Sequence, residues 1–340
     1  MSYFAGKTVL VTGATGLVGS HLVDELMAIG NVQVIALSRN EQKLKITFAK
    51  HLENPEFSYI AQDVSQPFDI NEKTVDVIFH AASPISGRTI ADAPIDVIYP
   101  NIFGTLNCLE LLRKQQTASG RNGRIVLFSS ATVYGNLSSE DISVSEQDTG
   151  IAAALDSNNS PYSESKRMIE VIARAYVKQH NIDAVIVRPS YIYGTAPSQP
   201  ETAFFSFLDK VIANEDILIN NSGLARRDNI YIDDAVSGLL VVCEKGEPGQ
   251  AYNISSNAEL GNFSAIDETA EIIARIASEN YGCSAKVLYN SGKSEETRTP
   301  GIMLNNTKLK SLGWQVTTSQ ADGIRNILAE SMNTRIGGNI

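Results

Sequence analysis

Short apolar runs alternate with longer, periodic segments along the first 190 residues of the chain. The apolar runs are rich in β-branched residues and are typical of buried strands: 7–12, 32–38, 57–61, 75–80, 124–129 and 183–188. Helical spacing of apolar residues is found before Gly30, in 101–116 and in 161–180. Apolar strands that alternate with helices are typical of a parallel sheet covered on both faces. The pattern therefore predicts an α/β fold with a doubly wound parallel sheet.

The pattern changes after about residue 195, where the predicted elements become shorter. Residues 202–214 and 263–279 have helical spacing, and 228–245 begin as a strand and continue as a helix. We therefore expect a second, smaller region after the sheet. Residues 136–160 are rich in Ser, Asp and Asn and are long for a connection, which favours a lid or a binding loop.

The composition is that of an ordinary globular protein with an acidic charge balance. The 28 Lys and Arg residues against 38 Asp and Glu residues give a net charge of −10, and 43% of the residues are hydrophobic. This apolar content excludes a disordered chain, and the acidity disfavours nucleic acid and anionic membrane as partners. An anionic small ligand would then need a few concentrated cationic or dipolar contacts.

The cysteines and the apolar runs bear on location. Cys108, Cys243 and Cys283 are odd in number, far apart and without metal-ligand spacing, which favours a reducing compartment and no metal site. The first residues do not have the pattern of a signal peptide, and no apolar run reaches the ~18 residues of a membrane span. The expected location is the cytosol.

A glycine-rich turn joins the first predicted strand to the first helix. The segment TGATGLVG places Gly13, Gly16 and Gly19 three residues apart. Small residues let the backbone approach a pyrophosphate, and the helix N-terminus supplies N–H groups and partial positive charge. In this strand–turn–helix context we expect a dinucleotide site rather than a tight turn without a ligand.

The ends of the next strands add candidate cofactor contacts. Ser38 and Arg39 end the second strand, where sites that prefer NAD usually have an acidic residue, and an Arg attracts the 2′-phosphate of NADP. This favours NADP over NAD, the alternative being that Arg39 is a solvated surface charge. His80 ends the fourth strand and is interpreted as structural. The other strand-end candidates are Asp63 and Val64, as contacts for the adenine, and Ala81, Ala82 and Ser83.

Tyr162 and Lys166, in PYSESK, lie one turn apart on one face of a predicted helix. The pKa values of free Tyr and Lys are about 10 and about 10.4, so neither side chain is a base at neutral pH. A neighbouring ammonium and a cationic nicotinamide ring both favour tyrosinate and should lower the pKa of Tyr162. Tyr162 would then exchange a proton with a sugar hydroxyl while hydride moves to or from the nicotinamide. Ser130, at the end of RIVLFSS, would help to hold the reacting oxygen.

Taken together and in order, these motifs resemble the extended short-chain dehydrogenases/reductases, and within them the nucleotide-sugar epimerase/dehydratase group. The resemblance runs from about residue 6 to 330 and rests on TGATGLVG, HAAS, NIFGTLN, SSATVYG, PYSESK, VRPSYIYG, RRDNIYIDD and LGW. It implies a Rossmann-type dinucleotide-binding domain over 1–190, a smaller C-terminal α/β domain for the substrate over 191–330, and a tail over 331–340.

The resemblance also assigns residues to the catalytic and cofactor sites. It implies Ser130, Tyr162 and Lys166 as the catalytic set, and a homodimer packed through helices at about 98–116 and 161–180. The further cofactor contacts, besides the glycines and strand ends above, are Thr15, Leu17, Val18, Asn101, Tyr162, Lys166 and Arg188.

The substrate implied by the resemblance is a nucleoside-diphosphate sugar. Arg227, in RRDNIYIDD, and Arg298, in ETRTP, match the arginines that bind the diphosphate, for which the planar guanidinium is suited. Tyr191 stands where the group usually has an Asn, so we expect an altered specificity. The remaining substrate candidates are Ser83, Ser86, Ser130, Ala131, Thr132 and Tyr162.

Two positions discriminate among the activities of the group. The 4,6-dehydratases have an Asp-Glu pair directly after the catalytic hydroxyl residue, and decarboxylases usually keep the Glu. Here those positions are Ala131 and Thr132, which are neither acids nor bases. We therefore expect NAD(P)-dependent hydride transfer at C4 by a nucleotide-sugar 4-epimerase, and neither a 4,6-dehydratase nor a decarboxylase. The alternatives are an NADPH-dependent 4-keto-sugar reductase, a reductase of a small carbonyl compound, and a non-enzymatic redox sensor or scaffold.

Overall fold

The computed structural model describes residues 2–70, 74–135, 141–150, 154–197, 200–219, 223–290 and 301–337, with side chains up to residue 332. Seven parallel strands form its main sheet, and the fold class expected from the sequence is confirmed. These strands are β1 (Thr8–Thr12), β2 (Gln33–Ser38), β3 (Phe57–Ala61), β4 (Val77–His80), β5 (Arg124–Phe128), β7 (Asp183–Pro189) and β11 (Ala251–Ile254).

The strand order in this sheet is β11-β7-β5-β4-β1-β2-β3. The chain builds outward from β1 to β3 on one side, then restarts at β4 on the other side of β1. In open parallel sheets, ligands bind at the carboxyl ends of the strands where the order reverses in this way. Gly13 and Ala81, which directly follow β1 and β4, therefore lie at the expected ligand position.

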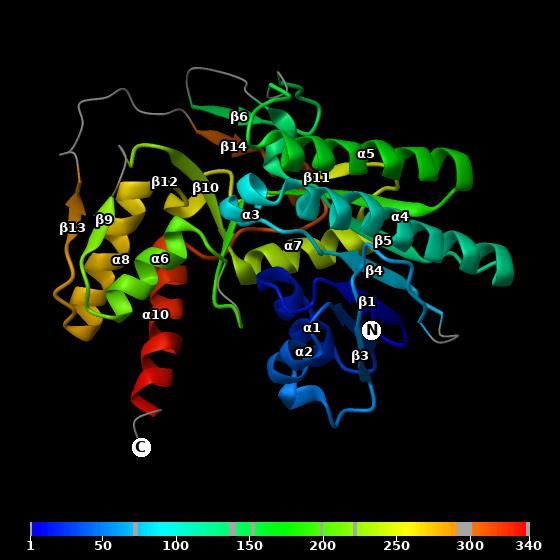
Figure 1. Ribbon diagram of the computed structural model, residues 1–340, viewed down its shortest axis with the longest axis horizontal. Helices are drawn as coiled ribbons and strands as arrows, with labels where there is room; N and C mark the ends of the chain where they lie inside the picture. The colour runs from blue at the N-terminus through cyan, green and yellow to red at the C-terminus, as the bar shows by residue number, and fades with distance from the viewer. Residues whose placement is uncertain are drawn as a thin grey trace.

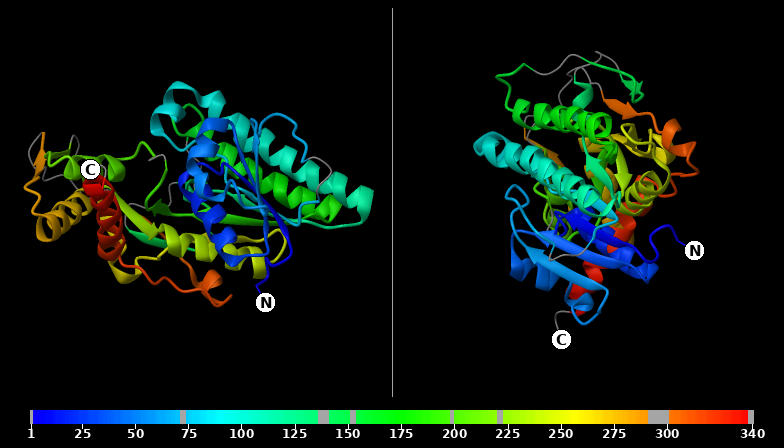
Figure 2. Two further views of the ribbon diagram at one scale, coloured as in Figure 1. Left: turned by 90° about the horizontal axis from the view of Figure 1, so that it is seen from below. Right: turned by 90° about the vertical axis from the view of Figure 1, so that its right-hand side faces the viewer.

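Helices cover both faces of the main sheet because the strands are apolar on both sides. Val9 and Val11 of β1 pack into one apolar cluster, with α1 (Leu17–Ile29) and α7 (Ile232–Lys245). Leu10 packs into a second cluster on the opposite face, with α4 (Pro94–Ser119) and α5 (Ser160–His180). Figure 2 shows α4 and α5 lying side by side on one side of the sheet, with α7 on the other.

The second half of the chain forms smaller sheets and a helical layer to one side of the main sheet (Figure 1). β10 pairs in parallel with β8 and antiparallel with β12, and β13 pairs with β9. Helices α6, α8 and α10 pack against one another. The bounds are β8 (Tyr191–Tyr193), α6 (Ala203–Ile212), β9 (Ile217–Ile219), β10 (Arg226–Tyr231), β12 (Phe263–Ala265), α8 (Ile266–Tyr281), β13 (Val287–Tyr289) and α10 (Gln320–Gly337).

Short elements complete the fold. Strand β6 pairs in parallel with β14, and so joins a segment of the first half to one near the C-terminus. Of the described helices, none is both long enough and apolar enough to cross a membrane. The remaining bounds are α2 (Glu41–Thr47), α3 (Gly87–Asp92), β6 (Ile142–Val144), β14 (Ile302–Leu304), α9 (Thr307–Lys310), and the 3-10 turns Ala49–His51, Ala131–Tyr134 and Glu259–Gly261.

Three elements differ from the sequence-based expectation. Helix α4 begins at Pro94 rather than near 101, because a proline suits the first turn and Pro100 is accommodated within the helix. The segment 263–279 begins as strand β12 before it turns helical. The polar connection 136–160, expected to be a lid or a loop, contains β6; its residues 136–140 and 151–153 lie outside the described residues.

Candidate active site

The glycine turn after β1 packs directly against the segment that follows β4. Gly13 has a φ of +65°, and a Cβ built there would lie 2.7 Å from the Cα atom of Ala82. A Cβ on Gly19 would lie 2.3 Å from the carbonyl oxygen of Gly13. Both positions therefore exclude any side chain, and the turn packs directly against its neighbouring backbone segments.

The first turn of α1 has the features of an anion site. Its N-cap, Gly16, offers no side-chain acceptor, and the turn contains no acidic residue. Backbone N–H groups at the start of a helix attract phosphate when no side chain satisfies them. Leu17, Val18 and Gly19 carry these N–H groups. The Thr15 hydroxyl lies 2.9 Å from the Ser38 hydroxyl and joins this turn to the end of β2.

Arg39 and Asp63 follow β2 and β3 at the same edge of the sheet. Arg39 is exposed, and its positive charge acts on Asp63. Asp63 accepts hydrogen bonds from the Ser65 N–H at 2.9 Å and the Ser65 hydroxyl at 2.7 Å. Burial raises the pKa of Asp63, but these two bonds and Arg39 outweigh it, so the pKa is lowered. Val64 is buried against α4.

His80 holds the ends of β1 and β4 together from inside the protein. Its Nδ1 lies 2.8 Å from the Thr12 hydroxyl, whose oxygen also accepts a hydrogen bond from the Ala82 N–H at 3.4 Å. Burial, with a smaller effect of the nearby Lys166, lowers the pKa of His80 to about 3. The ring is therefore neutral at physiological pH and supports the cofactor turn structurally. Ala81 and Ser83 complete this segment.

Ser130, Tyr162 and Lys166 are brought together by β5 and α5. Ser130 follows the end of β5, and its side chain is hydrogen-bonded to the Tyr162 phenol. Lys166 Nζ lies 5.7 Å from the centroid of the Tyr162 ring and donates a hydrogen bond of 2.6 Å to the carbonyl oxygen of Phe128. The three side chains predicted as the catalytic set therefore occupy one site.

The pKa values of this site differ from the expectation that Lys166 lowers the pKa of Tyr162. Burial raises the pKa of Tyr162, Ser130 opposes this by hydrogen bonding, and Tyr191 adds to the rise. Burial also lowers the pKa of Lys166 to about 7. Desolvation is therefore the largest cause of both shifts.

Asn101 connects α4 to the catalytic helix. Its side-chain N–H donates to the Ser165 hydroxyl at 2.8 Å, and that hydroxyl donates to the Tyr162 carbonyl oxygen at 2.8 Å. Asn101 Oδ1 is buried, and no hydrogen-bond partner for it lies among the described residues. The side chain faces the catalytic helix, as a residue that supports the site would.

Arg227 and Tyr191 lie on two neighbouring strands, β10 and β8. The guanidinium of Arg227, on β10, lies 4.8 Å from the centroid of the Tyr191 ring, on β8. Arg227 Nη1 donates to the carbonyl oxygen of Arg226 at 3.0 Å, and among the described residues no carboxylate is paired with the guanidinium. A guanidinium without a carboxylate partner retains donors for an anionic ligand.

The other substrate candidates are placed less directly. Ser86 donates to Glu201 at 2.9 Å, and so spans the two halves of the molecule. Ser83 donates only a long bond, of 3.5 Å, to Pro84. Ala131 and Thr132 begin the turn after Ser130, whose hydroxyl accepts the Thr132 N–H at 3.2 Å. Arg298 lies outside the described residues.

Arg188, expected among the cofactor contacts, has its guanidinium bound within the protein. It donates to both carboxylate oxygens of Glu170 at 2.8 Å, and to the Tyr134 hydroxyl and the Glu146 carbonyl at 3.0 Å. The structure thus joins it to α5 and not to the glycine turn. The sequence analysis did not predict this network. The position of Glu170, one turn beyond Lys166 on the same helix face, is the feature of the sequence that could have indicated it.

Comparisons with known proteins give matches over most of the chain. The model of the NAD dependent epimerase/dehydratase family matches residues 9–255. UDP-glucuronic acid decarboxylase 5 of Arabidopsis thaliana is 28% identical over 97% of this chain and 90% of its own length. Human dTDP-D-glucose 4,6-dehydratase is 26% identical over 94% of this chain and 88% of its own.

Solved structures extend the likeness to the fold. UDP-glucuronic acid 4-epimerase from Bacillus cereus, in complex with UDP-glucuronic acid and NAD, has a TM-score of 0.77 with this chain. The two sequences are 24% identical, and the match covers 96% of this chain and 99% of that one.

These relatives correct the expected activity. The expectation of a 4-epimerase that excludes 4,6-dehydratases and decarboxylases is wrong, because curated proteins of those two classes resemble nearly the whole chain. Ala131 and Thr132 do not carry the exclusion. These two positions show only which side chains follow Ser130. The chemical steps after C4 oxidation also depend on the substrate and on the other residues of the site.

Proposed function

Because the chain belongs to the NAD-dependent epimerase/dehydratase family, within the extended short-chain dehydrogenases/reductases, we propose that it oxidises C4 of a nucleoside-diphosphate hexuronic acid and releases CO2 from the product. One observation carries the proposal: Ser130, Tyr162 and Lys166 share one site, formed by β5 and α5 of the parallel sheet whose β1 is followed by the glycine turn.

The residues of the glycine turn fit a nicotinamide dinucleotide. Gly13 and Gly19 let the turn pack closely against the segment after β4 and against α1, and the first turn of α1 offers N–H groups that no side chain caps, as a pyrophosphate site requires. The bound oxidised nicotinamide supplies a hydride acceptor and a positive charge. We propose that Ser38 and Arg39 give a preference for NADP, since Arg39 is exposed, basic and beside the expected ribose.

The proton chemistry belongs to Tyr162. As phenolate it takes the proton of the 4-hydroxyl, and the Ser130 hydroxyl donates a hydrogen bond that favours this form. As phenol it returns a proton to the oxygen when the carbonyl is reduced. Lys166, charged below pH about 7, adds a positive charge next to the Tyr162 ring and anchors to β5.

Release of CO2 suits the residues that follow Ser130. A ketone at C4 makes the C6 carboxylate of a hexuronic acid a β-keto acid. When the C5–C6 bond breaks, its electron pair moves into the ketone, CO2 leaves, and a proton is later added at C5. The step removes no proton from carbon, so Ala131 and Thr132 are compatible with it. Ser130 and Tyr162 hydrogen-bond the enolate oxygen.

The nucleotide end of the substrate is assigned to the second half of the chain. We propose that residues 191–330 mainly bind the nucleotide sugar, and that 1–190 bind the cofactor and carry the acid/base residues. Arg227 supports this, because its guanidinium has no carboxylate partner in the described part of the chain. Arg298 is proposed as a second diphosphate contact.

A homodimer is proposed through α4 and α5. Apolar side chains are exposed at one-turn spacing on the two neighbouring helices: Ile95, Tyr99, Phe103, Met168 and Val171. Such a patch is typical of an interface, and a second copy would cover it. A cytosolic location is also proposed, supported by three free, buried cysteines.

The test is to incubate the purified protein with NAD or NADP and either UDP-glucuronic acid or dTDP-glucose, and to follow products by mass spectrometry. We expect UDP-glucuronic acid to lose CO2, and Tyr162→Phe to lose most of this turnover. Tyr281→Phe, on α8, is the matched control. If dTDP-glucose loses water and UDP-glucuronic acid does not react, the proposed activity is wrong and the protein is a dehydratase. No change in either sugar would overturn the proposed substrate class.

A further inference from the structure

Three consecutive residues at the end of β5 contact three successive turns of α5. The Phe128 carbonyl accepts from Lys166 at 2.6 Å, and the side chain of Ser130 is hydrogen-bonded to Tyr162. Between them, the Ser129 hydroxyl donates to Glu170 at 2.6 Å. Tyr162, Lys166 and Glu170 are four residues apart and lie on one helix face. The strand end and the helix are therefore fixed in register by three polar contacts.

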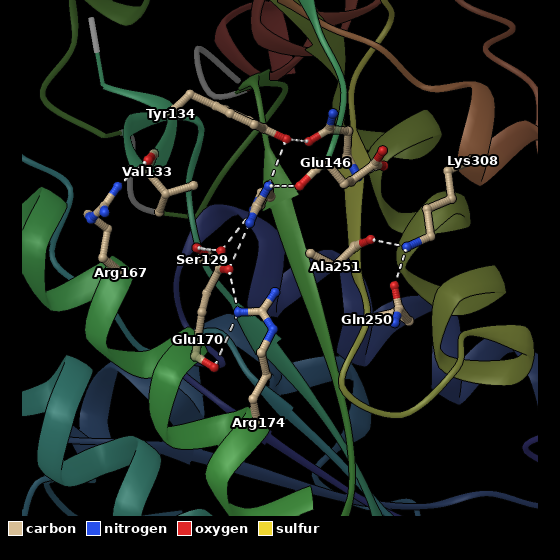
Figure 3. Close-up of polar contacts among 12 residues, drawn as sticks. Ser129, Val133, Tyr134, Glu146, Arg167, Glu170, Arg174, Gln250, Ala251 and Lys308 are labelled. Atoms are coloured by element: carbon tan, nitrogen blue, oxygen red, sulfur yellow. Dashed lines mark hydrogen bonds and ion pairs between the residues drawn. The ribbon is translucent and has the colours of Figure 1, made fainter. Parts of the chain in front are cut away.

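Glu170 is itself held from two sides. Its Oε1 accepts from the Ser129 hydroxyl and from Arg188 Nε at 2.8 Å, and its Oε2 accepts from Arg188 Nη2 at 2.8 Å and Arg174 Nη1 at 3.0 Å. Figure 3 shows the Glu170 carboxylate between Ser129 and Arg174. Arg188 lies on β7, the strand next to β5, so the carboxylate joins two strands of the main sheet to α5.

The network extends from Glu170 to the segment after Ser130. Arg188 also donates to the Tyr134 hydroxyl, which donates to Asn253 Oδ1 at 2.6 Å (Figure 3). Tyr134 ends the turn that Ser130 begins. Ser130 is therefore flanked by Ser129 and Tyr134, both of which are tied to the Glu170–Arg188 pair.

Glu170 has no free capacity for acid/base chemistry. Four donors occupy its two oxygens, and its side chain is only 5% exposed. Burial raises the pKa of Glu170, but the contacts with Arg188, Ser129 and Arg174 outweigh it and lower the pKa. A carboxylate that is buried, charged and fully bonded keeps its neighbours in place; it does not exchange protons at neutral pH.

We propose that Ser129 and Glu170 are positioning residues that hold the Ser130 hydroxyl against Tyr162 through the Ser129–Glu170 hydrogen bond. The inference rests on the proposed role of Tyr162 in proton transfer. It follows from the order of the contacts: Ser129 is one residue from Ser130, and Glu170 is two turns from Tyr162 on the same helix. A displacement of a reacting group by about 1 Å can cost about a hundredfold in rate.

The test uses Ser129→Ala in the full chain. Glu170 Oε1 keeps the Arg188 contact in this variant, so the carboxylate is not left unbonded. We expect kcat for the nucleotide sugar to fall about tenfold or more, with KM within about twofold of wild type. Ser163→Ala is the control, because it removes a buried hydroxyl from the same helix that bonds only Asn159 and Ser160, and it should keep kcat.

A second variant and a spectroscopic readout keep the test independent of the substrate. Arg174→Met removes one surface contact of Glu170 and should lower kcat by a smaller factor. Ultraviolet titration of the NAD-loaded protein, with Tyr162→Phe as the blank, should show the Tyr162 phenol ionising at higher pH in Ser129→Ala than in wild type. Tyr162 faces Ser130, Lys166 and Tyr191, and only the first of these contacts is altered.

The outcomes separate this inference from the proposed function. If wild-type protein turns over no nucleotide sugar, the proposed function fails, and the Tyr162 titration alone decides the positioning role. If Ser129→Ala and Arg174→Met both keep the wild-type kcat and the wild-type Tyr162 titration, the positioning role is overturned.

Discussion

At the scale of single residues, burial governs the candidate site. Lys166 is enclosed by the protein, so its pKa is lowered to about 7, and Tyr162 is a weaker acid than free tyrosine. The i, i+4 spacing predicted that the two side chains share a helix face, which the structure confirms. The direction of the Tyr162 pKa could not be predicted from spacing alone, because desolvation depends on what packs around the ring.

Replacing Lys166 by Met should change how stability depends on pH. In the wild type, the folded chain releases the Lys166 proton at pH about 7, whereas the unfolded chain retains it up to about 10.4. The unfolded state then binds more protons between these values. The free energy of unfolding of the wild type should rise, relative to Lys166→Met, by up to about 1.4 kcal/mol per pH unit above pH 7.

Urea denaturation of both proteins at pH 6, 7, 8 and 9 measures this difference. The difference in free energy of unfolding between the two proteins should be constant below pH about 7. Above that pH the wild type should become progressively more stable relative to Lys166→Met. A constant difference across the series would mean that Lys166 ionises normally in the folded protein.

Arg39 should determine which dinucleotide binds more tightly. We expect wild type to bind NADPH about tenfold more tightly than NADH, since a charge-assisted contact to the 2′-phosphate is lost with NADH. Arg39→Ala should abolish the difference by weakening NADPH alone. Arg121→Ala, which removes an exposed Arg after α4, is the control. Fluorescence titration gives the six dissociation constants, for the three proteins with each of the two dinucleotides, and a preference of wild type for NADH would contradict the prediction.

At the scale of elements, the apolar pattern predicted the strands and long helices well. The segment 57–61 is a strand with those bounds, and 161–180 differs from α5 by one residue. The short strands β6 and β14 could not be predicted, because each has three residues and depends on a partner far along the chain. β11, an edge strand of the main sheet with four residues, could not be predicted either.

The packing of the glycine turn against α1 can be tested at Gly19. Alanine normally stabilises a helix by about 0.5–1 kcal/mol relative to glycine. At Gly19 the new Cβ would lie 2.3 Å from the Gly13 carbonyl, so the turn must shift. We expect Gly19→Ala to lower the free energy of unfolding by about 1–3 kcal/mol and to weaken dinucleotide binding.

The matched control is Gly87→Ala, in the first turn of α3. A Cβ there meets nothing within 4 Å, so this variant should be neutral or slightly stabilising. Urea denaturation and dinucleotide titration of both variants measure the effect. Equal free energies of unfolding of the two variants would show that the glycine turn can shift to accommodate a Cβ at Gly19 without destabilising the protein.

At the scale of the whole molecule, a chain of net charge −10 is proposed to bind two anions. The general acidity argued against nucleic acid, but it did not show where local positive charge lies. The structure places the described candidates at separate points: the first turn of α1, Arg39, and Arg227 beside Tyr191. Arg227 was found from its motif, whereas its lack of a carboxylate partner required the fold.

The exposed apolar face of α4 and α5 should control assembly. We expect wild type to be a dimer and Phe103→Glu to be monomeric, because a charge would be buried against the partner copy. Ile46→Glu, on α2, changes a more exposed apolar residue outside this face and should remain dimeric. Sedimentation equilibrium distinguishes the states, and a dimeric Phe103→Glu would place the interface elsewhere.

We expect the site to remove hydride from C4 of a nucleotide sugar, with Tyr162 taking the hydroxyl proton. The most direct measurement is a single turnover of the protein, loaded with NADP and separately with NAD, with UDP-glucuronic acid that is unlabelled or deuterated at C4. The absorbance of reduced nicotinamide is followed. We predict that the absorbance rises, that deuterium at C4 slows the rise, and that Tyr162→Phe shows almost none. No rise, or a rise of the same rate with the deuterated sugar, would contradict the account.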